Sequence, residues 1–247
     1  MRYFVEISYN GTNYHGWQVQ PNANSVQAEI IKGFSVLFRN ETFECVGCGR
    51  TDTGVHAKQF YFHFDTKDIF DPELYTYKLN SILPKDISVH RIFKVDDEAH
   101  ARFNAVSRTY EYYVHDRKDV FMQKSSCFWP VKIDVDQMNQ ACETLLNYDD
   151  FTSFSKVHSD AYTNICDISK AIWTKEGHQY KFEITANRFL RNMVRAVVGT
   201  TLQVGEGKIS VDDFKAIVEA KDRGQAGKSV HGHGLYLSKI SYPFIED

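Results

Sequence analysis

A polar loop at residues 49–56 limits the possible fold more than any other feature, because strand-like sequence lies on both sides of it. Before the loop, residues 42–46 alternate polar and apolar side chains, and after it residues 58–65 are rich in aromatic rings, so both stretches are predicted strands. Three glycines that permit tight turns lie in or just before the loop: Gly47, Gly49 and Gly54. The loop is therefore expected to present Asp52 over a sheet edge, where catalytic groups often lie.

The residues of this loop permit several interpretations. The simplest is a hairpin loop in which Asp52 caps backbone amides and Arg50 forms a surface ion pair. A phosphate-binding loop is excluded, because Val55 and His56 stand where that loop needs lysine followed by serine or threonine. The tripeptide at residues 52–54 is that of aspartic proteases, whose site needs two carboxylates sharing a proton. The sequence contains this tripeptide once, so only a homodimer could form an aspartic protease.

Composition sets wider limits on the function. A chain of 247 residues can bury the core of one large domain or of two small ones. Its net charge of −3 does not indicate a nucleic-acid-binding protein, so a basic surface must be local if it exists. No apolar run is long enough to cross a membrane, the first residues do not resemble a signal peptide, and the five cysteines have no disulfide spacing. These features predict a cytoplasmic protein with reduced thiols.

Two pairs of residues have the chemistry of metal ligands. Cys45 and Cys48 form a C-x-x-C pair, but zinc would need two further ligands and the sequence has no second pair. His231 and His233 lie in a loop-like stretch without an accompanying cluster of ligands. We therefore expect the cysteines to be structural and the histidines to be ordinary loop residues, and no metal is predicted.

The predicted elements of the first half have a ferredoxin-like order. A helix with an apolar stripe begins after Asn24 or Ser25, and Asp71 followed by Pro72 opens a second helix. Two more strands are predicted, in addition to the pair that flanks the loop: residues 2–9 and 88–95. The order of the first half is therefore strand, helix, two strands, helix, strand.

The second half approximately repeats this order, without obvious repetition of the sequence. Its predicted elements are a strand at 106–115, a helix at 135–146, strands at 165–175 and 179–186, helices at 188–203 and 210–219, and a strand at 234–241. In the longest of these helices one side is apolar, and Arg188, Arg191 and Arg195 follow the other side at helical spacing. The sequence therefore predicts an α+β protein of two ferredoxin-like halves, residues 1–104 and 105–247, whose sheets meet at a central active-site cleft.

Five stretches match, in order, the motifs of one protein family. They are residues 9–18 (Y-x-G-x-x-Y-x-G-W-Q), 49–56 (G-R-T-D-x-G-V-H), 100–112 (A-R-F-x-A and R-x-Y-x-Y), 186–199 (A-N-x-F-x-x-x-M-V-R-x-x-V-G) and 234–237 (G-L-x-L). On these motifs the chain resembles the TruA family of tRNA pseudouridine synthases. One departure is that residues 229–233 read S-V-H-G-H, where the family commonly has a T-A-P segment.

The resemblance implies an isomerase that needs no cofactor and converts uridine to pseudouridine at positions 38, 39 and 40 of the tRNA anticodon stem-loop. The target base must leave the base stack before the enzyme can act on it. Several neighbouring targets imply that the RNA is recognised by shape and backbone more than by base identity. The resemblance also implies a homodimer in which one tRNA contacts both subunits.

The same resemblance assigns roles to five residues. It implies that Asp52 is the catalytic carboxylate and that Arg195 pairs with it and holds its orientation. Tyr110 matches an active-site tyrosine that stacks on the flipped uracil. Arg50 matches an arginine that helps displace the target base, and Leu235 matches an apolar residue that lines the pocket. Whether Asp52 attacks the sugar or the base, or takes a proton from the ribose, stays open.

Without the resemblance, these residues have simpler interpretations. Arg195 would be a solvated helix arginine, and Tyr110 would be a core ring with a bonded hydroxyl. A non-catalytic RNA-binding module is an alternative function, since paired ferredoxin-like halves with aromatic strands resemble RNA-recognition domains. Neither half has the glycine–aromatic strand signature of those domains, which weakens this alternative.

Overall fold

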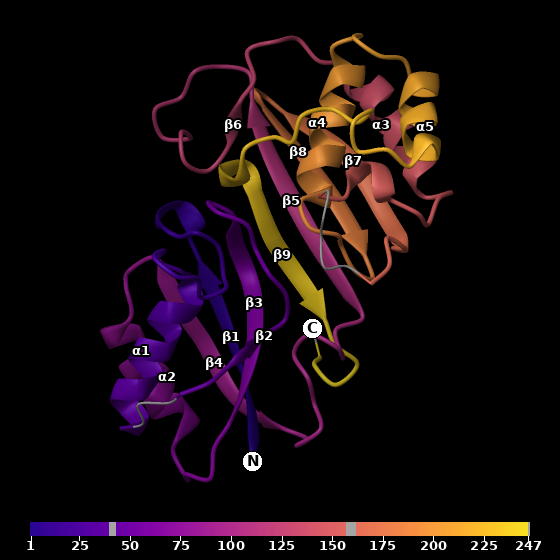
Figure 1. Cartoon of the computed structure of the whole chain (residues 1–247). Helices are drawn as coiled ribbons and strands as arrows, with labels where there is room; N and C mark the ends of the chain where they lie inside the picture. Colours follow the sequence, from indigo (N-terminus) through magenta and orange to yellow (C-terminus); the bar gives the residue numbers. More distant parts are fainter. Residues whose placement is uncertain (40–42, 157–161, 247) are drawn as a thin grey trace. The chain divides into compact units, whose positions relative to one another are not determined.

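The computed structural model of the chain describes residues 1–39, 43–156 and 162–246 (Figure 1). In this part of the chain there are five α-helices and nine strands, and the strand pairing is mostly antiparallel. This architecture confirms the predicted α+β class. The chain forms two compact units: residues 1–106 with the stretch from residue 237, and residues 107–236. The ferredoxin-like halves and their division at residue 104 stay predictions.

The first unit is an antiparallel sheet with two helices on one face (Figure 1). In the sheet, β1 lies between β4 and β3, and the short β2 pairs with β3. The elements are β1 (Arg2–Tyr9), α1 (Val26–Phe38), β2 (Val46–Gly47), β3 (His56–Asp65), α2 (Pro72–Ile82) and β4 (Ile87–Val95). Ser25 and Asp71 cap the two helices, because their side chains accept hydrogen bonds from backbone N–H groups of the first turn.

The strand predicted just before the loop, at residues 42–46, differs from the structure. β2 is Val46–Gly47, and residues 43–45 have no strand structure, although two of them are buried. Thr42 lies outside the described residues. The alternation of polar and apolar residues therefore marks which side chains are buried, and it does not by itself require a ladder of hydrogen bonds.

Aromatic rings form the core between α1 and β3. Phe34 is fully buried, and its ring centroid lies 5.2 Å from that of Phe64 and 5.7 Å from that of Phe62. Side chains two residues apart on a strand share a face, so Phe60 belongs to the same core. Trp17 lies 4.2 Å from Phe60 between centroids. The core of the first unit therefore extends from α1 to the polar loop that follows β1.

The second unit also has a sheet with helices on one face (Figure 1). Its strands lie in the order β5, β8, β7, and β6 pairs with β5 in parallel. The elements are β5 (Ser107–His115), β6 (Cys127–Phe128), α3 (Val135–Leu145), β7 (Ile168–Glu176), β8 (Gln179–Ala186), α4 (Met193–Gly205), α5 (Val211–Ala220) and the first residues of β9 (Leu235–Ser241). No helix in the described ranges combines the length and the apolar character that crossing a membrane requires.

The helix predicted at residues 188–203 begins later, at Met193. Asn192 has a φ of 68°, in the left-handed region, so a right-handed helix cannot run through it. Arg188 and Arg191 therefore precede the helix, and the predicted stripe of three arginines on one helix face is wrong. Of these three, Arg195 is the one on α4.

Phe34→Ala should lower the free energy of unfolding by about 3–5 kcal/mol, because it leaves a cavity where α1 meets β3. Val36 lies on the same helix and is 63% exposed, so Val36→Ala is the matched control and should cost less than about 0.5 kcal/mol. Urea unfolding followed by circular dichroism measures both variants. Equal, small losses would show that the aromatic core does not depend on Phe34.

Candidate active site

The loop that carries Asp52 is held by the polar loop that follows β1. The backbone N–H of Trp17 donates to the carbonyl oxygen of Thr51 at 3.3 Å. Further along, the backbone N–H of Gly54 donates to the carbonyl oxygen of Tyr14 at 3.2 Å. Two stretches that are far apart in the sequence, and that both match family motifs, therefore lie side by side on either flank of Asp52.

Two glycines make this contact possible. A Cβ atom on Gly16 would lie 2.2 Å from the carbonyl oxygen of Thr51, and one on Gly11 would lie 1.9 Å from that of Val55. Both distances are far shorter than van der Waals contact. Gly16 also has a φ of +89°, which favours glycine over other residues. The two backbones thus approach as closely as they do because neither position has a side chain.

Buried side chains fix the loop at both ends. Thr51 is buried, and its hydroxyl shares a 2.9 Å hydrogen bond with that of Tyr9. His56 is also buried, and its Nδ1 accepts a hydrogen bond from the backbone N–H of Gly11 at 3.1 Å. Because Nδ1 is an acceptor, it carries no proton. Asp52 lies between these two anchors and is half-buried, so a rigid loop presents its carboxylate.

Tyr14 connects the polar loop to the residue before β4. Its hydroxyl donates to a carboxylate oxygen of Asp86, and the backbone N–H of Asn10 donates to the carbonyl oxygen of Asp86 at 2.9 Å. Burial, and then the hydrogen bond to Asp86, raise the pKa of Tyr14 above its ordinary value. The phenol therefore stays protonated at neutral pH and remains a donor, which keeps the supporting loop in place.

Tyr110 and Tyr112 lie on the same face of β5, since they are two residues apart. Tyr110 is half-buried and meets Phe189 edge to face, with centroids 5.1 Å apart and ring planes at 89°. Tyr112 is fully buried, and its hydroxyl donates to the carbonyl oxygen of His231 at 2.9 Å. Burial raises the pKa of Tyr112 above its ordinary value, so this hydroxyl also remains a donor.

Arg195 holds the segment that leads to β9. Its Nε donates to the carbonyl oxygen of Val230 at 2.7 Å, and its own carbonyl oxygen accepts from the N–H of Val230 at 3.2 Å. Further along α4, a Cβ atom on Gly199 would lie 2.0 Å from the carbonyl oxygen of Lys228. The segment therefore lies directly against the helix. After one short turn it reaches the buried Leu235, the first residue of β9.

The structure places the five predicted site residues in two groups. Asp52, which is half-buried, and Arg50, which is exposed, belong to the first unit. Tyr110, Arg195 and Leu235 belong to the second unit. There, Arg195 and the strand of Tyr110 both contact the segment that ends at Leu235. The pairing of Asp52 with Arg195 stays a prediction.

Sequence reasoning missed three residues that shape these surroundings. His56 has no structural role in the sequence-based interpretation, although its place at the end of the loop, where the next strand begins, is compatible with its burial beside Gly11. Tyr112 could have been suspected from the Y-x-Y alternation on β5. Val230 gave no signal, because it acts through its backbone carbonyl, which any residue supplies.

In the part of the chain that the structure describes, no three His, Cys, Asp or Glu side chains are grouped so that they could hold a metal ion. The five cysteines are buried and form no disulfide. Burial raises the pKa of the Cys45 thiol to about 12 and that of the Cys166 thiol to about 11. These two cysteines are therefore protonated at neutral pH and poor nucleophiles.

Known proteins resemble the whole chain. A family model described as tRNA pseudouridine synthase matches residues 141–243. The chain is 51% identical to tRNA pseudouridine synthase A of Parabacteroides distasonis, over 98% of this chain and 96% of that protein. The chain belongs to the tRNA pseudouridine synthase A family. Its identity to the Bacteroides thetaiotaomicron member is 49%, over 98% of this chain and 91% of that protein. Its identity to the Bacillus subtilis member is 40%, over 98% of this chain and 99% of that protein.

Membership of this family confirms the resemblance drawn from the five sequence stretches. It also confirms the predicted class of enzyme, since pseudouridine synthases are isomerases. The family model and the similar synthases both favour a pseudouridine synthase over a non-catalytic RNA-binding module and over a dimeric aspartic protease. The family motifs at residues 9–18 and 49–56 gain a physical explanation, because they are the two loops that pack against each other.

Gly16→Ala should displace Thr51 and Asp52, because the added Cβ would collide with a backbone carbonyl at a strained φ. We expect the free energy of unfolding to fall by about 2 kcal/mol or more, with a large loss of turnover. Gly49 is a matched control from the loop itself, since a Cβ there meets no atom within 4 Å. Gly49→Ala should keep both properties. Thermal unfolding and tRNA turnover measure them, and an unaffected Gly16→Ala would contradict the close approach.

Proposed function

We propose that the protein isomerises uridine to pseudouridine at positions 38, 39 and 40 of the tRNA anticodon stem-loop, with Asp52 as its one catalytic carboxylate. The observation that carries this proposal is the rigid presentation of Asp52. Hydrogen bonds fix its loop at Thr51, Gly54 and His56, on both sides of the carboxylate. The relatives named tRNA pseudouridine synthase A support tRNA as the substrate.

The reaction needs a positioned carboxylate and no redox partner. It breaks the N1–C1′ bond of uridine, turns the detached base and forms a C5–C1′ bond, while the hydrogen on C5 leaves as a proton and N1 gains a proton. Nothing is oxidised overall, so we propose catalysis without a cofactor. Asp52 can act as a nucleophile toward the sugar or the base, or as a base toward the ribose. A half-buried carboxylate on a fixed loop suits each of these routes.

We assign Arg195 to the orientation of Asp52. The bond from its Nε to Val230 uses one of the five N–H donors of the guanidinium and fixes the plane of the group. A planar, fixed guanidinium can meet a carboxylate with two parallel hydrogen bonds, which a lysine cannot do. This geometry supports a role for Arg195 in orienting Asp52. Arg195 also has a structural role, because its bond to Val230 holds the segment that leads to β9.

We assign Tyr110 to stacking on the flipped uracil, with Leu235 as an apolar wall. Tyr110 is half-buried, and its edge-to-face contact with Phe189 fixes the ring plane. A ring that is held in place but not fully covered suits a base that enters from solvent. Arg50 is exposed beside Asp52, which suits a side chain that enters the RNA as the target base leaves.

The remaining parts of the proposal concern the architecture. The strand order β4, β1, β3, β2, with both helices on one face, supports a ferredoxin-like first half. We propose that the two halves meet at the active-site cleft, that the protein is a homodimer whose subunits share one tRNA, and that it acts in the cytoplasm. These three statements rest on the family.

Asp52→Asn should abolish turnover while leaving folding and tRNA binding nearly unchanged, because it keeps the shape and removes the reactive carboxylate. Asp212→Asn, at an exposed position of α5, changes the net charge equally and is the matched control. Release of tritium from tRNA transcripts that carry 5-³H-uridine measures turnover. Near-normal release by Asp52→Asn would remove Asp52 from the mechanism. No release by the wild type, with peptide cleavage instead, would favour the protease.

Tyr110→Phe keeps the ring and should keep tRNA affinity, so any loss of rate reports on the hydroxyl. Tyr110→Leu removes the ring and should lose about 1–3 kcal/mol of stacking with the base. Tyr77 is 72% exposed on α2, so Tyr77→Leu is the control for loss of a tyrosine ring. Single-turnover rates and dissociation constants separate these effects. If Tyr110→Leu matched the control, Tyr110 would be a structural ring only.

A further inference from the structure

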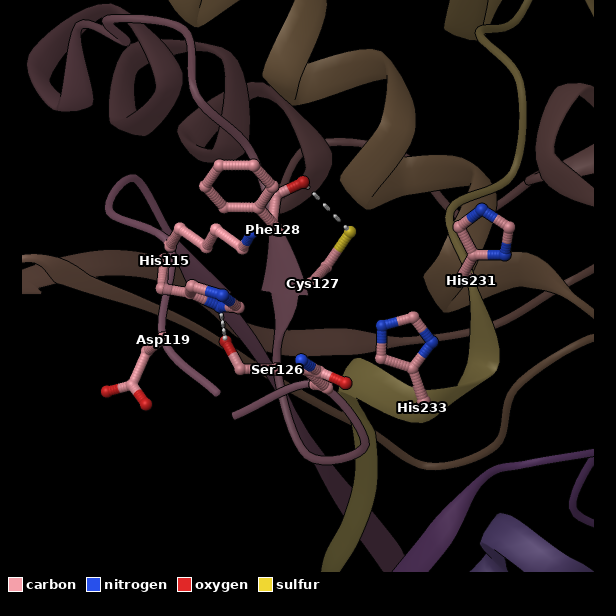
Figure 2. Close-up of a pocket in the computed structure, with 9 residues that line it drawn as sticks. His115, Asp119, Ser126, Cys127, Phe128, His231 and His233 are labelled. Carbon is pink, nitrogen blue, oxygen red and sulfur yellow. Dashed lines mark hydrogen bonds between the residues drawn. The ribbon is translucent and has the colours of Figure 1, made fainter. Parts of the chain in front are cut away.

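The second unit contains a pocket of about 520 Å³ that none of the five predicted site residues lines (Figure 2). Its walls come from the end of β5, from β6 with the loop at residues 116–126, and from the turn that contains His231 and His233. A pocket of this volume can hold a small organic molecule or one nucleotide. The catalytic roles proposed above make no use of it.

Flat rings form much of the wall of this pocket. His231 and His233 stack with centroids 5.6 Å apart, and His115 and Phe128 lie 5.4 Å apart on the other side (Figure 2). His115 donates to or accepts from Ser126 Oγ at 2.9 Å, and burial lowers the pKa of this histidine. The His115 ring is therefore neutral at pH 7. Flat rings that also carry hydrogen-bonding nitrogens suit a planar nucleobase, which needs both stacking surfaces and polar partners.

The loop at residues 116–126 carries more positive than negative charge. Lys118 lines the pocket, and Arg117 and Lys124 are exposed on the same loop. Of its two carboxylates, Asp116 accepts hydrogen bonds from the β7–β8 hairpin, and Asp119 lines the pocket. The loop thus carries three cations and two carboxylates, and Lys118, its one cation that lines the pocket, can meet a phosphate group.

The same loop exposes apolar side chains to solvent. Phe121 is 90% exposed and Val120 is 64% exposed. A soluble domain has little reason to expose a phenylalanine so completely, and exposed aromatic rings among lysines and arginines are typical of surfaces that bind single-stranded nucleic acid. The surface around the pocket thus suits single-stranded nucleic acid, as the interior of the pocket suits a nucleobase.

The pocket and the proposed uracil site share one segment of the chain. Arg195 holds the carbonyl of Val230, and Tyr112 holds the carbonyl of His231, whose side chain lines the pocket. Four residues after His231, Leu235 begins β9. Because of these contacts, an occupant of the pocket touches the segment that carries one wall of the proposed uracil site.

We infer that the pocket binds one unpaired nucleotide of the tRNA other than the uridine that is isomerised. Its base lies among His231, His233 and Phe128, and its phosphate meets Lys118. The inference rests on the proposed function, because it takes the occupant to be part of the same tRNA. Bound there, this nucleotide helps to set the position of the RNA relative to the segment before β9.

Binding of tRNA to variants of the pocket tests this inference. Phe128→Leu removes a ring, His231→Ala keeps the carbonyl that Tyr112 needs, and Lys118→Ala removes the phosphate contact. We expect each to raise the tRNA dissociation constant, by about tenfold for the ring and histidine variants. Tyr77→Leu and Lys215→Ala, at exposed positions of α2 and α5, are matched controls and should bind as the wild type does.

Crosslinking of the wild-type protein gives a second measurement that does not depend on a variant folding. Transcripts that carry 4-thiouridine are irradiated in the complex, and mass spectrometry identifies the crosslinked peptides. Crosslinks to peptides with residues 115–128 or 231–233, from a nucleotide other than the target, support the inference. It is overturned if crosslinks form elsewhere and none forms to these peptides, or if folded pocket variants bind tRNA like the controls.

Tritium release by the wild type separates this inference from the proposed function. Release together with unchanged affinity in the pocket variants overturns the inference and leaves the synthase intact. Absence of release from every tRNA transcript overturns the proposed function instead, and the inference with it. Weak binding and slow release confined to the pocket variants is the result that we expect.

Discussion

The close approach of two backbones beneath Asp52 is the constraint on which the candidate site depends. Gly11 and Gly16 lie against the carbonyl oxygens of Val55 and Thr51, at positions where any Cβ would collide. Hydrogen bonds between the same two loops then fix the peptide planes around Asp52. The carboxylate thus obtains a defined position from main-chain contacts, which depend little on side-chain rotamers. Such preorganisation is what a catalytic group needs.

In the second unit, side chains hold an irregular segment in place. The segment before β9 has little regular structure, and it is held by Arg195 through Val230 and by Tyr112 through His231. Burial raises the pKa of Tyr112, so its hydroxyl remains a donor to His231 at neutral pH. One segment can therefore serve two surfaces, the wall at Leu235 and the histidine wall of the pocket.

Periodicity and motifs predicted the α+β class, the starts of the first two helices, after Asn24 or Ser25 and at Asp71 followed by Pro72, and the loop at residues 49–56. They failed where the backbone leaves its usual conformation. Asn192 adopts a left-handed φ, which apolar spacing cannot reveal. The predicted start of α4, at residue 188, therefore lies before the observed start at Met193. Alternation near residues 42–46 indicated burial without the pairing that defines a strand. The contact between the two loops could not be predicted, since it joins residues far apart in sequence through their main chains.

The locked loops also affect how the protein responds to heat. Most loops open locally long before a domain unfolds, and their amide hydrogens exchange within seconds. Here the amides of Trp17 and Gly54 are bonded across two loops, and Trp17 packs on the aromatic core through Phe60. We therefore expect the loop of Asp52 to open together with the aromatic core of the first unit, without a melting step of its own. The position of Asp52 should then be lost only when this unit unfolds.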